Sequence, residues 1–222
     1  MTAVDSAPQR PLYRVSALLT GLVRMWRAWA VVVPVIVANA LLQGLLLLPG
    51  LTPALEPAFV AVAILSFLVL VASFCLVATA LLEATTGPVD WRSVYRRSWR
   101  RFPPLLLWSL VLLVAVLLGL VLYIIPGFVI LALFPYLLLA AVDGRSNPPV
   151  VNFRTIRARV GRWIVTVIGS AIILFVAWLF SLQDFFIAGS PAAVYEWLFQ
   201  GFIASWLTCA WALVYRTANP PS

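Results

Sequence analysis

The chain has 222 residues, of which 64% are hydrophobic and only 10% are charged. Soluble globular domains carry about 25% charged residues, and disordered chains are poor in apolar residues, so this composition excludes both classes. All 15 basic residues are arginine, histidine is absent, and the formal net charge is +8. The composition therefore indicates a polytopic membrane protein, and the use of arginine to the exclusion of lysine indicates a GC-rich, bacterial genome.

The amino-terminal segment, residues 1–28, is polar and basic. It lacks a short apolar core followed by a small-residue cleavage site, so we do not expect a secretory signal peptide. Its apolar residues between positions 12 and 27 recur at helical spacing, with arginines between them. We therefore predict a basic amphipathic cytoplasmic segment.

Six apolar stretches follow, and each is about as long as the roughly 20 residues that a membrane-spanning helix needs. None of them contains aspartate, glutamate or arginine. They cover residues 29–48, 58–82, 105–123, 127–142, 163–182 and 197–215. We predict an all-α polytopic membrane protein with a six-helix domain over residues 29–216 and a short cytoplasmic tail, 217–222.

Prolines and glycines set the expected shapes of these helices. Pro126 and Gly127 together predict a tight turn between the third and fourth spans, because proline lacks an N–H and glycine tolerates unusual dihedral angles. Pro34 and Pro135 lie inside the first and fourth spans. We expect kinks there, because membrane helices tolerate such prolines.

The arginines predict the orientation in the membrane. Four precede the first span, five lie between the second and third, five lie between the fourth and fifth, and one follows the sixth. The other connections carry only Glu56, Asp184 and Glu196. We expect the protein in the plasma membrane. The positive-inside rule then places both termini and both basic loops in the cytoplasm.

Two of the basic segments resemble interfacial amphipathic helices. In residues 90–102, which Asp90 would N-cap, aromatic residues fall on one arc and arginines on the other, and residues 150–163 repeat the design. Together with the amino-terminal segment, these predict three transmembrane hairpins, each preceded by a basic helix. The pattern fits an old internal repeat, or the repetitive look of any six-helix protein that obeys the positive-inside rule.

The stretch from 90 to 180 resembles the membrane domain that accompanies some glycerophosphoryl diester phosphodiesterases and also occurs in many stand-alone bacterial membrane proteins. The resemblance lies in the segments Trp91-Arg92-Ser93, Arg97-Ser98-Trp99-Arg100-Arg101-Phe102, Tyr123-Ile124-Ile125-Pro126-Gly127-Phe128, Asp143-Gly144-Arg145-Ser146 and Arg159-Val160-Gly161-Arg162-Trp163. It implies a six-helix membrane fold of largely unassigned function. The soluble phosphodiesterase domain and its histidines are absent here, so we do not expect its activity.

The arginines of the two basic loops are the first candidate site. They are Arg92, Arg96, Arg97, Arg100, Arg101, Arg154, Arg157, Arg159 and Arg162. They can contact anionic lipid headgroups or a cytoplasmic partner protein, or they can simply determine topology. We do not expect nucleic acid, because these side chains lie within a turn or two of membrane spans.

Two further candidate sets lie inside the spans. Asn39 and Gln43 share a face of the first span and can line a polar cavity or form interhelical hydrogen bonds. A face of small residues runs along the sixth span and can pack within the chain or dock on another membrane protein. Its members are Gly201, Ala204, Ser205, Thr208 and Ala212.

The same inventory argues against catalysis. Without histidine or lysine, and with every carboxylate outside the spans, no acid–base pair can form within the bilayer, and we expect no metal and no cofactor. An enzyme that uses Glu83, Asp90 or Asp143 at the interface is the least favoured hypothesis. We expect an accessory or scaffolding subunit of a larger membrane assembly, such as a lipid-transport or envelope-trafficking complex. The alternative is a small permease or facilitator for lipid or apolar cargo.

Overall fold

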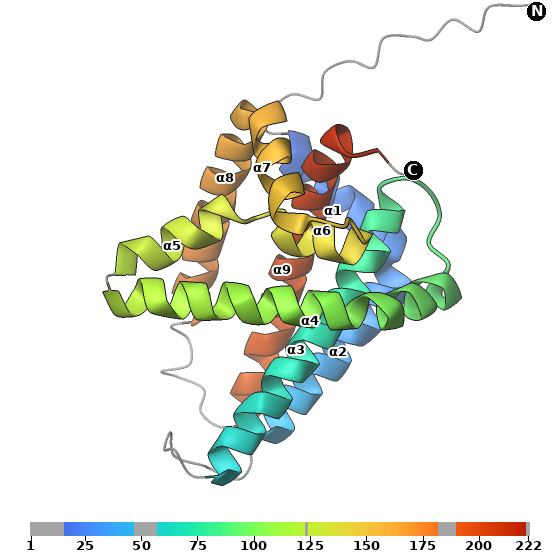
Figure 1. Ribbon diagram of the computed structural model, residues 1–222. Coiled ribbons are helices and arrows are strands. Elements are labelled where there is room, and N and C mark those ends of the chain that lie inside the picture. Colours follow the sequence, from blue (N-terminus) through green and yellow to red (C-terminus); the bar gives the residue numbers. More distant parts are fainter. Residues whose placement is uncertain (1–15, 47–56, 123, 182–189, 221–222) are drawn as a thin grey trace, which may run out of the picture.

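The computed structural model describes residues 16–46, 57–122, 124–181 and 190–220. In this part of the chain all regular structure is helical (Figure 1). The elements are α1 (Ser16–Met25), η1 (Trp26–Ala28), α2 (Trp29–Leu46), α3 (Pro57–Ala84), α4 (Trp91–Leu122), α5 (Ile124–Leu133), α6 (Leu137–Asp143), α7 (Pro148–Ala158), α8 (Val160–Ser181) and α9 (Ser190–Ala218). Residues 1–15, 47–48, 123, 182 and 221–222, together with Glu56 and Asp184, belong to the predictions above but lie outside the described residues.

Six helices in the described ranges are long and apolar enough to cross a membrane. They are Ala17–Leu46, Pro57–Ala84, Trp91–Leu122, Ile125–Asp143, Val160–Leu179 and Ala192–Ala218. Several extend beyond the predicted apolar stretches. The first begins in the basic amino-terminal segment, and the third includes five arginines at its start. The first and third spans are therefore continuous with the basic segments that precede them.

The helix α4 continues through Pro103 and Pro104, although proline in a helix interior removes a hydrogen bond and crowds the preceding turn. Both prolines are exposed, as are Trp99 and Arg100 one turn earlier. The carbonyl groups that lose their intrahelical partners therefore lie at an accessible surface. This explains how residues 90–102, predicted as a helix in front of the third span, form its first turns.

The helices α2, α3 and α9 pack side by side, and α1 and α8 lie against α9. Figure 1 shows α4 crossing this group, with α5 running back alongside it and with α6 and then α7 lying above the middle of α4 in this view. The main core forms where α3, α6 and α9 meet, and it contains the fully buried Tyr136 and Tyr215. These two rings pack with centroids 6.3 Å apart, and Trp211 meets Tyr136 edge-on at 5.3 Å.

The predicted fourth span, residues 127–142, is divided into α5 and α6 by a break at residues 134–136. Pro135 lies in this break and accounts for it, because it cannot donate the next helical hydrogen bond. Asn152 of α7 supplies the missing partners. Its amide nitrogen donates to the Leu133 carbonyl (2.8 Å), and its amide oxygen accepts from the Tyr136 backbone N–H (2.9 Å). The expected kink is thus a full interruption with a fully buried asparagine beside it.

The turn predicted at Pro126 and Gly127 is wrong, because both residues lie in the first turn of α5. A proline there loses no helical hydrogen bond. Gly127 instead allows α4 and α5 to approach closely. A Cβ built on Gly127 would lie 2.6 Å from Leu120 Cδ2, and one built on Gly119 would lie 2.8 Å from the Gly127 backbone nitrogen. The glycine therefore serves packing between helices.

The second basic loop also differs from its prediction. Residues 150–163 do not form one helix, because α7 ends at Ala158 and α8 begins at Val160. Arg159 lies between them with φ −142° and ψ 42°, outside the helical region. The buried face of α7 includes Asn152 and Thr155. Its orientation is therefore set by polar contacts to the core as well as by its apolar stripe.

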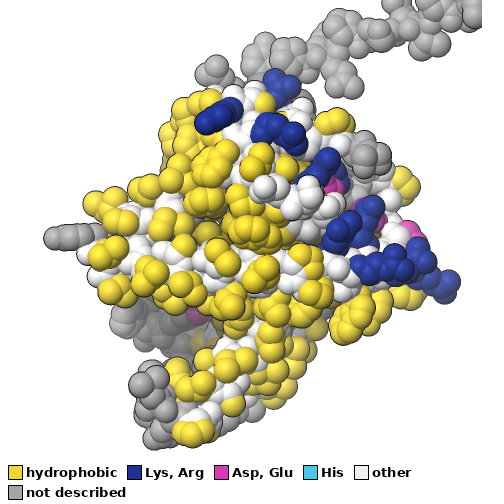
Figure 2. Space-filling view, viewed as in Figure 1, with side chains coloured by type: hydrophobic (Ala, Val, Ile, Leu, Met, Phe, Trp, Pro, Cys, Tyr) yellow, Lys and Arg dark blue, Asp and Glu magenta, His cyan; other side chains and the backbone are white. Residues whose placement is uncertain are grey.

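The surface divides into two parts in Figure 2. Dark blue arginine side chains gather along one side of the molecule, over the start of α4 and around α7, while the rest of the visible surface is almost entirely hydrophobic. Exposed leucine and valine side chains are numerous on α4, where Leu118 and Val121 are examples. This arrangement suits a protein whose solvent over most of its surface is lipid.

Candidate functional site

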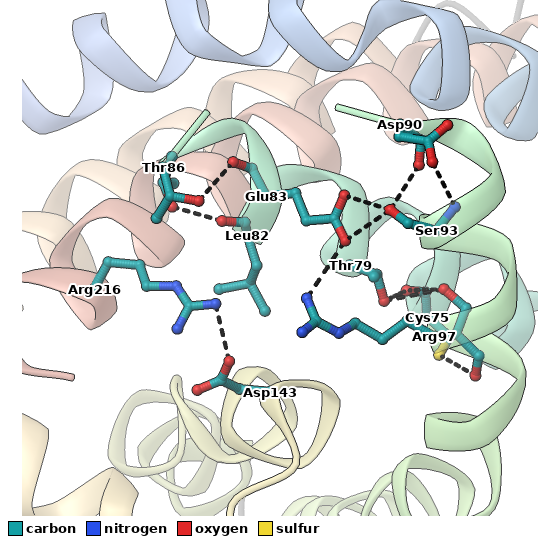
Figure 3. A network of polar contacts seen from close by, with 12 residues as sticks. Cys75, Thr79, Leu82, Glu83, Thr86, Asp90, Ser93, Arg97, Asp143 and Arg216 are labelled. Carbon is teal, nitrogen blue, oxygen red and sulfur yellow. Dashed lines mark hydrogen bonds and ion pairs between the residues drawn. The ribbon is translucent and has the colours of Figure 1, made fainter. Parts of the chain in front are cut away.

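Two carboxylates lie among the arginines where α3 and α6 end. Glu83 is one residue before the end of α3, and Asp143 is the last residue of α6. Arg97 of α4 and Arg216 of α9 point toward the space between them (Figure 3). Residues far apart in the sequence therefore meet in one charged network.

Asp143 is held by three donor groups. Arg216 Nη2 forms an ion pair with Oδ1 (2.9 Å), while Arg145 Nε (2.9 Å) and the Tyr215 hydroxyl (3.0 Å) both donate hydrogen bonds to Oδ2. The Asp143 and Arg216 side chains are only 13% and 12% exposed. The hydrogen bond to Asp143 is the main cause that raises the pKa of Arg145, so this guanidinium stays charged at any physiological pH. Asp143 thus organises one side of the network.

Glu83 is held less firmly. The Ser93 hydroxyl lies 3.2 and 3.3 Å from its two carboxylate oxygens but has a closer acceptor, the Asp90 carbonyl at 2.9 Å, and Arg97 Nη1 lies 3.4 Å from Oε1. The Arg97 side chain is 59% exposed. An ion pair this exposed and this long contributes little stability. Arg97 can therefore leave Glu83 for another anion at little cost.

The neighbouring turn fixes the start of α4. Asp90 accepts hydrogen bonds from the backbone N–H groups of Arg92 and Ser93, both at 3.2 Å. The N-cap that the sequence predicted at Asp90 is thereby confirmed. One turn further, Ser98 of α4 donates to Thr79 of α3 at 3.0 Å. These bonds set the direction in which the arginines of α4 project.

Two adjoining cavities lie in this network and share Glu83, Arg97 and Arg101. The inner cavity, about 290 Å³, is lined by Leu82, Glu83, Thr86, Arg97, Arg101, Asp143, Gly144, Arg145 and Arg216. The outer cavity, about 660 Å³, is lined by Glu83, Ser93, Arg96, Arg97, Arg100 and Arg101. The inner lining carries four guanidinium groups and two carboxylates, so positive charge exceeds negative charge by two.

Gly144 makes room for one of these guanidinium groups. It closes α6 in the left-handed conformation, with φ +79°, which is the usual role of glycine after a helix end. A Cβ at this position would fall on the guanidinium of Arg101. Arg101 therefore rests on the bare backbone of Gly144 and is held in the wall of the inner cavity.

The structure brings together some predicted arginines and separates others. Four of the five arginines of the first basic loop line the outer cavity, whereas Arg92 lies over the ring of Trp91, 5.3 Å from its centroid. In the second basic loop, Arg154 donates to Asn219 (3.3 Å) near the end of α9. The remaining members, Arg157, Arg159 and Arg162, belong to α7, α8 and the junction between them.

Sequence reasoning missed the inner cavity. The sequence places Arg145 and Arg216 only in the topology argument, and it names Glu83 and Asp143 only in the least favoured hypothesis, an enzyme at the interface. Their meeting depends on α6 packing against α3 and α4, and on α9 returning to the same end. The one local signal was the Asp143-Gly144-Arg145 sequence, which places a carboxylate, a left-handed turn and a guanidinium in succession.

The polar residues predicted inside the spans lie at a second place. A groove of about 320 Å³ between α2, α3 and α9 is lined by Val35, Ile36, Asn39, Leu70, Ser73, Phe74, Val77, Trp197, Gln200, Gly201, Ala204, Ser205 and Thr208. Asn39 also accepts a hydrogen bond from Ser73 at 3.4 Å. Gln43, by contrast, pairs with Ser66 (2.7 Å), and Ala212 lies in the main core. The small-residue face of α9 thus contributes partly to the groove and partly to the interior.

Comparisons with family models, with curated proteins and with solved structures give no match to this chain. The resemblance of residues 90–180 to the membrane domain of the phosphodiesterase-associated family therefore stays a prediction. Among the described residues, no three side chains of the metal-binding types lie close enough to hold an ion.

Proposed function

We propose that this chain is a non-enzymatic integral membrane protein that serves as an accessory or scaffolding subunit of a larger membrane assembly and holds anionic lipid headgroups at its arginine-rich end. One observation carries the proposal. Arginines outnumber carboxylates in the cavities at the ends of α3, α4, α6 and α9, next to an apolar surface. Each basic side chain near an anionic bilayer surface contributes about 1 kcal/mol of attraction.

The orientation belongs to the same proposal. With the arginine-rich end in the cytoplasm, both termini are cytoplasmic and the spans form three hairpins in the plasma membrane. The exposed rings of Trp91, Tyr95 and Trp99 near the start of α4 then lie at headgroup level, the usual place for aromatic residues in a membrane protein. The basic segments before the first, third and fifth spans would act as amphipathic helices at the interface.

The groove between α2, α3 and α9 supports the role as a subunit. Gly201, Ala204, Ser205 and Thr208 present small side chains there. Small residues allow helix backbones to approach closely in lipid, where packing replaces the hydrophobic effect. A transmembrane helix of another subunit, in a lipid-transport or envelope-trafficking complex, fits this surface.

The same groove favours a second candidate, a facilitator for lipid or apolar cargo. Its walls are mostly apolar, and its polar members are uncharged, such as Asn39 and Ser73. Ion-coupled transporters usually carry ionisable groups within their spans, so uncoupled movement of an apolar or amphiphilic molecule is the form of transport that this lining suits.

Purification of the tagged protein from native membranes in mild detergent tests the main proposal. We expect a stoichiometric membrane partner and retained anionic lipid. Recovery as an isolated, lipid-free monomer would contradict the proposal. Reconstitution into vesicles addresses the alternative, because flux of a fluorescent lipid through the purified protein alone is expected only of a facilitator.

Orientation is tested separately with thiol probes. A cysteine at Ser93 or Ser146 is expected to resist a membrane-impermeant reagent in intact cells, whereas one at Thr52 or Ser190 is expected to react. The native thiols give little background, since Cys75 and Cys209 are both buried. Labelling of position 93 from outside would show that the orientation is the opposite of the proposed one.

A further inference from the structure

We propose that the inner cavity is a binding site for a phosphomonoester group, the dianionic end of a lipid such as phosphatidic acid or of a soluble phosphorylated compound. This rests on the proposed function and makes it specific, because a general attraction for anionic headgroups requires no defined pocket. Charge is the first argument. The lining has an excess of two positive charges, and a phosphomonoester carries close to two negative charges near pH 7.

Geometry is the second argument. The four guanidinium groups come from α4, from the turn after α6 and from α9, so they surround a ligand from separate directions. Guanidinium groups bind phosphate oxygens through paired N–H donors, which gives both affinity and selectivity for shape. Arg145 and Arg216 are pre-positioned by Asp143, and the Arg101 guanidinium lies against the backbone of Gly144. The side chains of Arg145 and Arg216 therefore need little further ordering when the ligand binds.

An unpaired donor is the third argument. Arg216 Nε is buried and has no hydrogen-bond partner among the described residues. Such a group is costly in a folded protein, and a missing water or ion is one explanation for it. Arg216 lines the inner cavity, so a phosphate bound there lies next to a guanidinium group whose hydrogen-bonding capacity is not fully used.

The two carboxylates have different roles in this site. Asp143 stays in place, because three donors hold it. Glu83 is paired with the exposed Arg97 over 3.4 Å, so the arriving phosphate can take Arg97 from it. The outer cavity adds Arg96 and Arg100 at the approach, where they attract the anion before it enters.

The test is titration of the purified full-length protein in detergent with four probes: short-chain phosphatidic acid, short-chain phosphatidylglycerol, glycerol 3-phosphate and inorganic phosphate. Phosphatidic acid is expected to bind roughly tenfold more tightly than phosphatidylglycerol, whose phosphodiester carries one charge. Arg101→Gln is expected to weaken binding of phosphatidic acid roughly tenfold. Arg27→Gln is the matched control, because it removes the same charge from an exposed site outside both cavities.

Glu83→Gln is the second variant and keeps the test decisive if Arg101→Gln does not fold. It removes a negative charge from the lining, so we expect binding of phosphatidic acid to strengthen about threefold or more. Weaker binding of phosphatidic acid by this variant would overturn the proposal.

The other outcomes separate the two proposals. If both lipids bind equally and Arg27→Gln weakens their binding as much as Arg101→Gln does, the attraction comes from the positive surface as a whole. The proposed phosphomonoester site is then wrong, while the proposed role in holding anionic headgroups stands. If glycerol 3-phosphate or inorganic phosphate binds as tightly as phosphatidic acid, the pocket stands with a soluble ligand and the lipid role fails. If none of the four probes binds, both proposals fail.

Discussion

Two of the polar networks in the part of the chain that the structure describes differ in how they are completed. At the break between α5 and α6, the neutral side chain of Asn152 pairs with the Leu133 carbonyl and the Tyr136 N–H, and Trp163 donates to the Ala132 carbonyl at 3.0 Å. At the arginine-rich end, guanidinium groups outnumber carboxylates around two cavities. The chain itself pairs these backbone groups of the first network, although the buried Tyr136 hydroxyl beside them has no partner among the described residues. The second network has unmatched positive charge that can bind an anion.

This difference separates structure from function. A buried neutral network that satisfies its own members stabilises one arrangement of the helices. A charged network with unmatched charge at an open cavity contributes less to stability and more to attraction of an anion. Substitutions in the two networks should therefore affect different measurements.

The largest loss of stability is expected from Asn152→Leu. This change leaves the Leu133 carbonyl and the Tyr136 N–H without partners in a buried place, and each unpaired group costs about 1–3 kcal/mol. Thermal unfolding in detergent measures the effect. The control is Asn147→Ala at the exposed N-cap of α7, where about 1 kcal/mol is expected. Equal stability of the two variants would show that the break does not need Asn152.

A smaller loss is expected from Asp143→Asn. Arg216 and Arg145 then lose their charged partner, and because Arg216 is largely buried we expect the free energy of unfolding to fall by about 2–3 kcal/mol. Asp90→Asn is the matched control, since asparagine caps a helix as well as aspartate does. A loss in the control as large as that in Asp143→Asn would point to general charge effects.

Within the spans, Ser66→Ala removes the hydrogen bond to Gln43. Hydrogen bonds between membrane helices contribute about 0.6 kcal/mol on average, so a shift of that size is expected in the same unfolding assay. A loss several times larger would place this neutral pair among the principal supports of the fold.

The smallest effect on stability is expected from Glu83→Gln. Its partner Arg97 is mostly exposed, and such ion pairs contribute about 0–1 kcal/mol. The unfolding midpoint should therefore barely move, although the same substitution should strengthen binding of the phosphomonoester. A destabilisation comparable to that of Asp143→Asn would mean that Glu83 supports the fold and does not merely tune the cavity.

The six apolar helices were predictable because each is a local property of about 20 consecutive residues. The N-cap at Asp90 was predictable for the same reason. The ends of the helices were less predictable. The prolines at positions 103 and 104 looked like the edge of a span, yet α4 passes through them. Gly127 looked like part of a turn, yet it forms a close contact with Gly119 in another helix.

The candidate site was predictable only in part. The arginines of the first basic loop are visible in the sequence as a cluster, and four of them line one cavity. Arg145 and Arg216 are 71 residues apart and meet only because α9 returns to the end of α6. Nothing local in the sequence distinguishes Asn152, which the break in the fourth span makes essential.

By itself, the sequence determined that the protein is helical and has six segments able to cross a bilayer, because length and hydropathy are sums over neighbouring residues. It also determined the total positive charge and its concentration in a few segments. Only the tertiary structure decided which arginines share a cavity, which carboxylates oppose them and where the fourth span is interrupted. These depend on distances between residues far apart in the chain, and electrostatic and hydrogen-bonding energies change steeply with such distances.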